Sequence, residues 1–92
     1  MTEPLQRTLR PSADVLESTV GAETVLLHLG RDAYYGLDRV GTRIWNLLKE
    51  GVSAEAICCA VAGEYDASLE MVRSDCDAFL ADLLAHGIVI EF

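Results

Sequence analysis

Apolar and polar residues alternate along the first part of the chain in the way typical of β-strands that bury one face. The alternation is clearest at residues 24–29, where Val25, Leu27 and Leu29 share one face. Two short segments that contain glycine separate the runs and predict turns between them. The pattern therefore predicts antiparallel strands at residues 13–19, 24–29 and 33–37, with a further short strand over 5–10.

The last of these predicted strands, residues 33–37, carries two adjacent tyrosines. A period of two places Tyr35 and Leu37 on one face and Tyr34 on the other. Glycine weakens a strand interior and often marks a close backbone approach, so we expect such an approach at Gly36.

From residue 38 onward the apolar spacing changes to that of a helix. Asp38 is a suitable N-cap, and Gly51 follows the last periodic residue as a C-terminal stop. Glycine costs about 1 kcal/mol inside a helix, so we expect close packing at Gly41. The apolar stripe of this helix consists of Val40, Ile44, Leu47 and Leu48, widened by Trp45.

Two further helices follow, each preceded by a serine that can cap it, Ser53 and Ser68. The second is expected over residues 54–63, and the third is expected to stop at His86 and Gly87. Residues 88–90 predict a short terminal strand. The inner face of the second helix would carry Ile57, Cys58 and Val61, and that of the third Leu69, Val72, Cys76, Phe79, Leu80, Leu83 and Leu84.

The order of elements predicts one α+β domain spanning residues 1–92, a three-stranded antiparallel sheet followed by three helices. Three helices with a β-hairpin are the composition of a winged helix-turn-helix domain, and here the strands come ahead of the helices. A chain of 92 residues with 51% hydrophobic residues is enough for one modest core and leaves little room for a deep enzyme cleft. No apolar run approaches the roughly 20 residues of a membrane span, and the N-terminus has no apolar signal core, so we expect a cytoplasmic protein without a membrane partner.

The formal net charge of −8 disfavours nucleic acid as a partner, because a phosphate backbone repels an acidic surface. A DNA-reading third helix would need arginine and lysine, yet Arg73 is outnumbered there by four carboxylates. DNA binding by a winged helix therefore stays only a second hypothesis.

The sequence contains no recognisable catalytic or metal-binding constellation. Neither histidine lies at metal-ligand spacing from the cysteines, and no phosphate-binding loop or cofactor motif is present. We therefore predict no catalytic residue, no metal and no cofactor, and a set of reduced cysteines in or near the core, Cys58, Cys59 and Cys76. A small enzyme or redox protein that uses these thiols is a third hypothesis.

An ordered set of residues resembles the PqqD-like family of peptide-recognition domains, over roughly residues 14–92. Within that family the chain is most similar to the stand-alone leader-recognition proteins of lasso-peptide biosynthesis. Quinone-pathway members usually carry Pro-Glu-Gly ahead of the helices, whereas Tyr-Tyr-Gly stands here, which favours a peptide natural-product pathway. The matching residues are Tyr35, Leu37, Asp38, Val40, Gly41, Ile44, Trp45, Leu47, Leu48, Gly51, Ser53, Glu64, Tyr65, Val72, Asp75, Phe79, Leu80, Leu83, Gly87 and Ile88.

The resemblance implies a non-catalytic adaptor for a ribosomally made precursor peptide. Such a protein binds the precursor leader and presents it to a cysteine-protease-like leader peptidase and to an ATP-dependent lasso cyclase. A peptide chaperone of another peptide-modification pathway is the alternative within the same family.

The exposed sheet edge, residues 33–37, would accept the leader as an added strand, because an open edge offers unpaired N–H and C=O groups. The resemblance makes the third helix the far wall of the groove. We expect Tyr35, Leu37, Ile44 and Trp45 to tie the edge strand to the first helix, leaving Tyr34 for the partner. The predicted peptide-binding residues are Ala33, Tyr34, Tyr35, Gly36, Leu37, Val72, Asp75, Cys76, Phe79 and Leu83.

Overall fold

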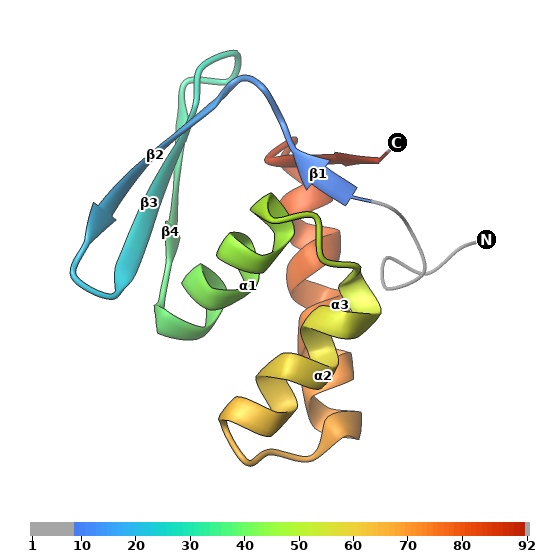
Figure 1. Ribbon diagram of the computed structural model, residues 1–92. Helices are drawn as coiled ribbons and strands as arrows, with labels where there is room; N and C mark the ends of the chain where they lie inside the picture. Colours follow the sequence, from blue (N-terminus) through green and yellow to red (C-terminus); the bar gives the residue numbers. More distant parts are fainter. Residues whose placement is uncertain (1–8, 92) are drawn as a thin grey trace.

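A computed structural model describes residues 9–91 (Figure 1). The elements, in chain order, are β1 (Leu9–Pro11), β2 (Val15–Val20), β3 (Glu23–His28), β4 (Ala33–Leu37), α1 (Arg39–Lys49), α2 (Ala54–Glu64), α3 (Leu69–Ala85) and β5 (Val89–Glu91). This order confirms the predicted α+β fold of a three-stranded antiparallel sheet followed by three helices. Within the described residues, no helix is long and apolar enough to cross a membrane.

The main sheet has the strand order β2-β3-β4, and both pairings are antiparallel. It lies to one side of the helices in Figure 1, with β4 leading directly into α1. Strand β4 has the predicted bounds and forms one edge of this sheet. A second sheet, which the sequence pattern did not predict, pairs β1 with β5 and joins the two ends of the described chain. The strand predicted over residues 5–10 lies mostly outside the described residues.

The face of β3 that reaches the core is not the face with the clearest alternation. Thr24, Leu26 and His28 are the buried residues of this strand, and Leu26 is fully buried against the helices. Val25 and Leu27 are therefore half-buried on the opposite, outer face of the sheet. Strand β3 is apolar on both faces, which is why the alternation alone could not indicate the inner one.

Helix α1 packs against the inner face of the sheet and supplies the largest buried side chain, Trp45. The indole N–H of Trp45 donates to Glu17 on β2 at 3.3 Å, and Lys49 forms an ion pair with the same carboxylate at 2.8 Å. The polar contact of Trp45 therefore joins α1 to β2, the edge strand opposite β4.

The helix starts follow local hydrogen bonding, as predicted from the sequence. The Asp38 side chain accepts a hydrogen bond from the Gly41 N–H at 2.8 Å, and Ser53 and Ser68 cap α2 and α3 in the same way. Each such cap satisfies a backbone donor that the helix itself leaves unpaired. Gly51 and Gly87 have positive φ angles just beyond α1 and α3, which glycine adopts without steric cost.

Two details of the predicted helix faces differ from the structure. Leu69, expected on the inner face of α3, is exposed at the first turn of that helix. Cys59 is also exposed, whereas Cys58 and Cys76 are buried, and all three thiols are free. Cys59 follows the buried Cys58 by one residue, and a helical step of about 100° turns it toward solvent.

Candidate functional site: an open strand edge beside an apolar pocket

The free edge of β4 presents the main-chain groups of Tyr34 and Gly36. The Leu29 N–H donates to the Asp14 carbonyl at 2.9 Å, so Asp14 and Leu29 form a hydrogen-bonded pair in line with the β2–β3 register. Bonded and non-bonded pairs alternate along antiparallel strands. Leu27 therefore bonds toward β2, and its opposite residue Tyr34 has no main-chain partner on β3.

The same alternation applies to the rest of β4. Ala33, Tyr35 and Leu37 use their main-chain groups in the pairing with β3, and Tyr34 and Gly36 direct theirs toward the open side. The two outward residues are separated by one position, which is the spacing at which an added antiparallel strand forms its hydrogen bonds.

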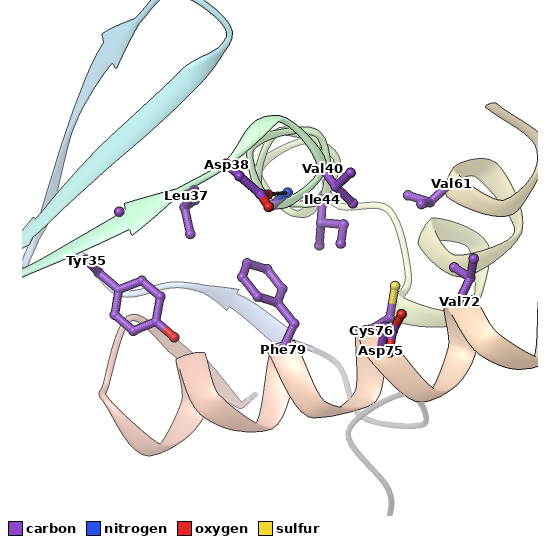
Figure 2. A pocket seen from close by; sticks show the side chains of 12 residues that line it. Tyr35, Leu37, Asp38, Val40, Ile44, Val61, Val72, Asp75, Cys76 and Phe79 are labelled. Atoms are coloured by element: carbon purple, nitrogen blue, oxygen red, sulfur yellow. Dashed lines mark hydrogen bonds between the residues drawn. The ribbon is translucent and has the colours of Figure 1, made fainter. Parts of the chain in front are cut away.

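An apolar pocket of about 440 Å³ lies beside this edge (Figure 2). Its walls come from β4, α1, α2 and α3, so four elements that are separate in the sequence form one concave surface. Most of the lining atoms belong to aliphatic or aromatic side chains. The lining residues are Tyr35, Gly36, Leu37, Asp38, Val40, Gly41, Ile44, Val61, Val72, Asp75, Cys76 and Phe79.

Phe79 extends from α3 toward α1 and occupies the middle of the space between them (Figure 2). A Cβ atom at Gly41 would lie 3.3 Å from the Phe79 ring and 3.3 Å from the Asp38 carboxylate. The close packing predicted at Gly41 is therefore confirmed. At Gly36 a Cβ atom would meet nothing within 4 Å, so none of the described residues makes the close approach predicted there.

One end of the groove between β4 and α3 is closed by contacts of Tyr35. The Tyr35 hydroxyl donates to the Asp82 carboxylate, and its ring lies edge-on to His86, with 5.4 Å between the ring centroids. Nδ1 of His86 lies 2.8 Å from the Asp82 carbonyl oxygen. Tyr35 thus ties the edge strand to α3. The prediction had paired Tyr35 with α1, but its hydroxyl and ring contacts are with the last turns of α3.

The pocket contains two carboxylates in different states. Asp38 is engaged as the cap of α1. Asp75 is exposed and forms no ion pair or side-chain hydrogen bond with the described residues. An acceptor without a partner at the rim of an apolar pocket suits a ligand side chain that has an apolar body and a polar donor at its tip.

The thiols near the pocket do not favour covalent chemistry. Burial raises the pKa of the Cys76 thiol to about 12 and also raises the pKa of Cys58. Because the thiolate is the nucleophilic form, both groups are unreactive near neutral pH. Cys76 therefore contributes an apolar surface, and no group of metal-binding side chains occurs within the described residues.

The structure brings most of the predicted site residues together. Ala33 and Tyr34 lie on the β4 edge outside the pocket lining, and Leu83 is fully buried in the core. Those that line the pocket are Tyr35, Gly36, Leu37, Val72, Asp75, Cys76 and Phe79. The remaining lining residues were not among the predicted peptide-binding residues: Asp38, Val40, Gly41, Ile44 and Val61. Val40 belongs to the apolar stripe of α1, and its exposure follows only from its neighbours in space.

Comparisons with known proteins agree with this geometry. The family model described as coenzyme PQQ synthesis protein D (PqqD) matches residues 23–89. The chain belongs to the PqqD family. The predicted family is thereby confirmed, and a comparison with curated protein sequences found no match.

Two solved structures resemble this PqqD-family chain. One, described as TbiB1 in complex with the TbiA(beta) leader peptide, is 39% identical, with a TM-score of 0.83 over 87% of this chain and 93% of that chain. The other, a lasso peptide synthetase B1 complexed with the leader peptide, is 19% identical, with a TM-score of 0.83 over 90% of this chain and 98% of that chain. At that identity the second structure shows the shared fold alone.

Proposed function

We propose that this protein is a non-catalytic adaptor of lasso-peptide biosynthesis that binds the leader of a precursor peptide by strand addition at β4. One observation carries the proposal: the open main-chain groups of Tyr34 and Gly36 run beside an apolar pocket, as a peptide strand with alternating side chains requires. The relative at 39% identity, solved with a leader peptide, supports it.

The strand edge and the pocket have different tasks in this mechanism. Each main-chain hydrogen bond contributes about 0.5–1.5 kcal/mol whatever the leader sequence. Each apolar leader side chain that enters the pocket contributes about 1.5–3 kcal/mol, and only suitable side chains fit. The edge therefore orients the leader, and the pocket selects among peptides.

Asp75 refines the selection at the pocket rim. Its carboxylate has no partner among the described residues, so a leader residue with a hydroxyl or a cationic tip gains a hydrogen bond there without displacing one. Val72 and Phe79 line the wall next to it, and they would hold the apolar part of the same side chain.

The bound precursor is then presented to the enzymes that modify it, a cysteine-protease-like leader peptidase and an ATP-dependent lasso cyclase. The adaptor contributes no bond-breaking group of its own, because the thiols near the pocket are protonated at neutral pH. Its contribution is to hold the leader in an extended form, which reduces the ordering cost that a flexible peptide carries into the enzyme complex.

A titration tests the proposal directly. Fluorescence anisotropy with a labelled lasso-precursor leader should give saturable binding, and a scrambled leader and a random DNA duplex of matched length should bind at least tenfold more weakly. Incubation of the purified protein with full precursor and ATP should leave the precursor mass unchanged. Equal binding of the authentic and the scrambled leader would contradict the recognition role, and processed peptide would contradict the non-catalytic role.

A further inference from the structure

Three parts of the leader site meet at Gly41. This residue is buried near the start of α1 and lines the pocket. A Cβ atom placed there would lie 3.3 Å from Cζ of Phe79, 3.3 Å from Oδ1 of Asp38 and 3.4 Å from Cβ of Leu37. These atoms belong to the pocket wall on α3, to the cap of α1 and to the end of β4. A side chain at position 41 would therefore need at least one of them to move by a few tenths of an ångström.

The three neighbours differ in how easily they can move. The Asp38 carboxylate is held by the hydrogen bond that it accepts from the Gly41 N–H at 2.8 Å. Leu37 is fully buried, and its Cβ atom can move only together with the backbone of β4. The Phe79 atom is the far end of a half-buried side chain beside an open pocket. Phe79 is therefore the group that yields first.

The direction of that movement follows from how Phe79 is anchored. Its side chain begins on α3 and its ring tip meets α1 at Gly41, so the ring spans the space between the two helices (Figure 2). Tyr35 lies on one side of the ring, and Val72 and Cys76 lie on the other. A ring that is pushed at its tip cannot retreat into the packed helix that carries it. It swings sideways instead, into space that a leader side chain would fill.

We propose that Gly41 is a positioning residue for leader selection: its missing side chain lets Phe79 lie against α1, and the ring in that position sets which apolar leader side chains fit the pocket. This role rests on the proposed function and names a residue that determines the selectivity of the same site. Because one methylene group more or less in an apolar pocket changes selection about tenfold, a displaced ring is enough to alter it.

Gly41→Ala tests the role of Gly41, and Gly63→Ala is the matched control. Both glycines lie within helices and neither has a positive φ angle, so alanine by itself favours the helix at either position. A Cβ atom at Gly63 would meet nothing within 4 Å, and Gly63 does not line the pocket. Only the change at position 41 should therefore affect Phe79.

The probes are a labelled lasso-precursor leader and variants of it in which each apolar side chain in turn is replaced by alanine, titrated by fluorescence anisotropy. The replacement that weakens binding to the wild-type protein most defines the truncated leader. Gly41→Ala should bind the authentic leader about fivefold more weakly than wild type and the truncated leader within twofold, because the truncated side chain leaves room for the displaced ring. Gly63→Ala should bind both as wild type does. An equal loss for both leaders would indicate a general loss of structure and would overturn the inference.

A second substitution checks that Phe79 transmits the effect. Leucine lacks the ring tip that meets position 41, so adding Gly41→Ala to Phe79→Leu should change leader affinity less than twofold. The same loss in both backgrounds would overturn the inference, because another neighbour would then carry the effect. If Gly41→Ala alone does not fold, the double variant should fold. A double variant that also fails to fold would place the clash at Leu37 or Asp38, which overturns the inference as well.

A readout without leader separates this role of Gly41 from the proposed function. The chain has two phenylalanines, so selective labelling with carbon-13 gives two sets of ring signals, and Phe79→Leu assigns them. Gly41→Ala should shift the Phe79 ring signals in two-dimensional NMR spectra, and Gly63→Ala should leave them in place. Unshifted signals overturn the inference whether or not leader binds. Shifted signals in a protein whose wild type binds no leader would overturn the proposed function and leave the contact of Gly41 with Phe79 standing.

Discussion

The two edges of the main sheet, β4 and β2, offer a partner similar main-chain groups in different surroundings. On β4, Tyr34 and Gly36 point their main-chain groups outward, and on β2 the same alternation turns Glu17 and Thr19 outward. Beside β4 lies the apolar pocket, whereas none of its lining residues comes from β2. An open edge supplies affinity for any extended peptide, and the adjoining pocket makes one edge selective.

Proline substitutions on the two edges should give the largest difference. Tyr34→Pro removes an outward N–H of β4 and places a ring where the leader main chain would lie, so leader affinity should fall at least tenfold. Thr19→Pro removes an outward N–H of β2 and should leave leader affinity within twofold of wild type. Isothermal titration calorimetry measures both, with circular dichroism to confirm that each variant is folded. Equal losses from the two variants would mean that the edges are equivalent.

A charge reversal at the pocket rim should have a smaller effect. Asp75→Lys replaces the free acceptor with a cation and should weaken leader binding about fivefold, or about 1 kcal/mol, for a leader with a donor at that position. Asp14→Lys changes the net charge equally at a site outside the pocket. If both variants lose the same affinity, long-range charge is responsible and the rim contact is not. Asp77 is a poor control, because it is half-buried and its Oδ1 has no hydrogen-bond partner.

Loss of the Tyr35 hydroxyl should loosen β4 beside α3 without removing a group that contacts the leader. Tyr35→Phe keeps the ring against His86 and removes the hydrogen bond to Asp82. The free energy of unfolding should fall by about 1 kcal/mol, and leader affinity by about two- to threefold, because the strand edge is less firmly held beside α3. Urea denaturation and leader titration give the two values. Unchanged stability together with unchanged leader affinity would show that this contact does not hold β4 in place.

The cysteines should have the smallest effect on binding. At pH 8 iodoacetamide should modify Cys59 alone, because Cys59 is exposed and burial raises the pKa of Cys58 and Cys76. The alkylated protein should bind leader as the untreated protein does. The folded state holds these thiol protons more tightly, so the free energy of unfolding should fall as pH rises above about 9, the ordinary thiol pKa. Loss of binding on alkylation of Cys59 would favour the thiol-dependent hypothesis.

The features predicted well from the sequence depend on local interactions. The caps Asp38, Ser53 and Ser68 act on residues three positions away, and the bounds of β4 follow from the turn before it and the cap after it. The close packing at Gly41 was also predictable, because glycine inside a helix needs a reason.

The features missed depend on contacts between distant segments. The inner face of β3 could not be predicted because both of its faces are apolar. Tyr35 and Asp82 are 47 residues apart, and Trp45 and Glu17 are 28 residues apart, so no local pattern links them. The pocket combines β4 with three helices, and the part of Val61 in it follows only from how α2 packs on α3.

The difference between the two edges is tested most directly by residue-level amide hydrogen exchange with and without leader. In the free protein the Tyr34 and Gly36 amides point to the open side and should exchange rapidly. With leader at saturation, their exchange should slow at least tenfold, while exchange at Glu17 and Thr19 should not change. Tight leader binding without slowing at Tyr34 and Gly36 would contradict strand addition at β4, and slowing on β2 would place the leader on the other edge.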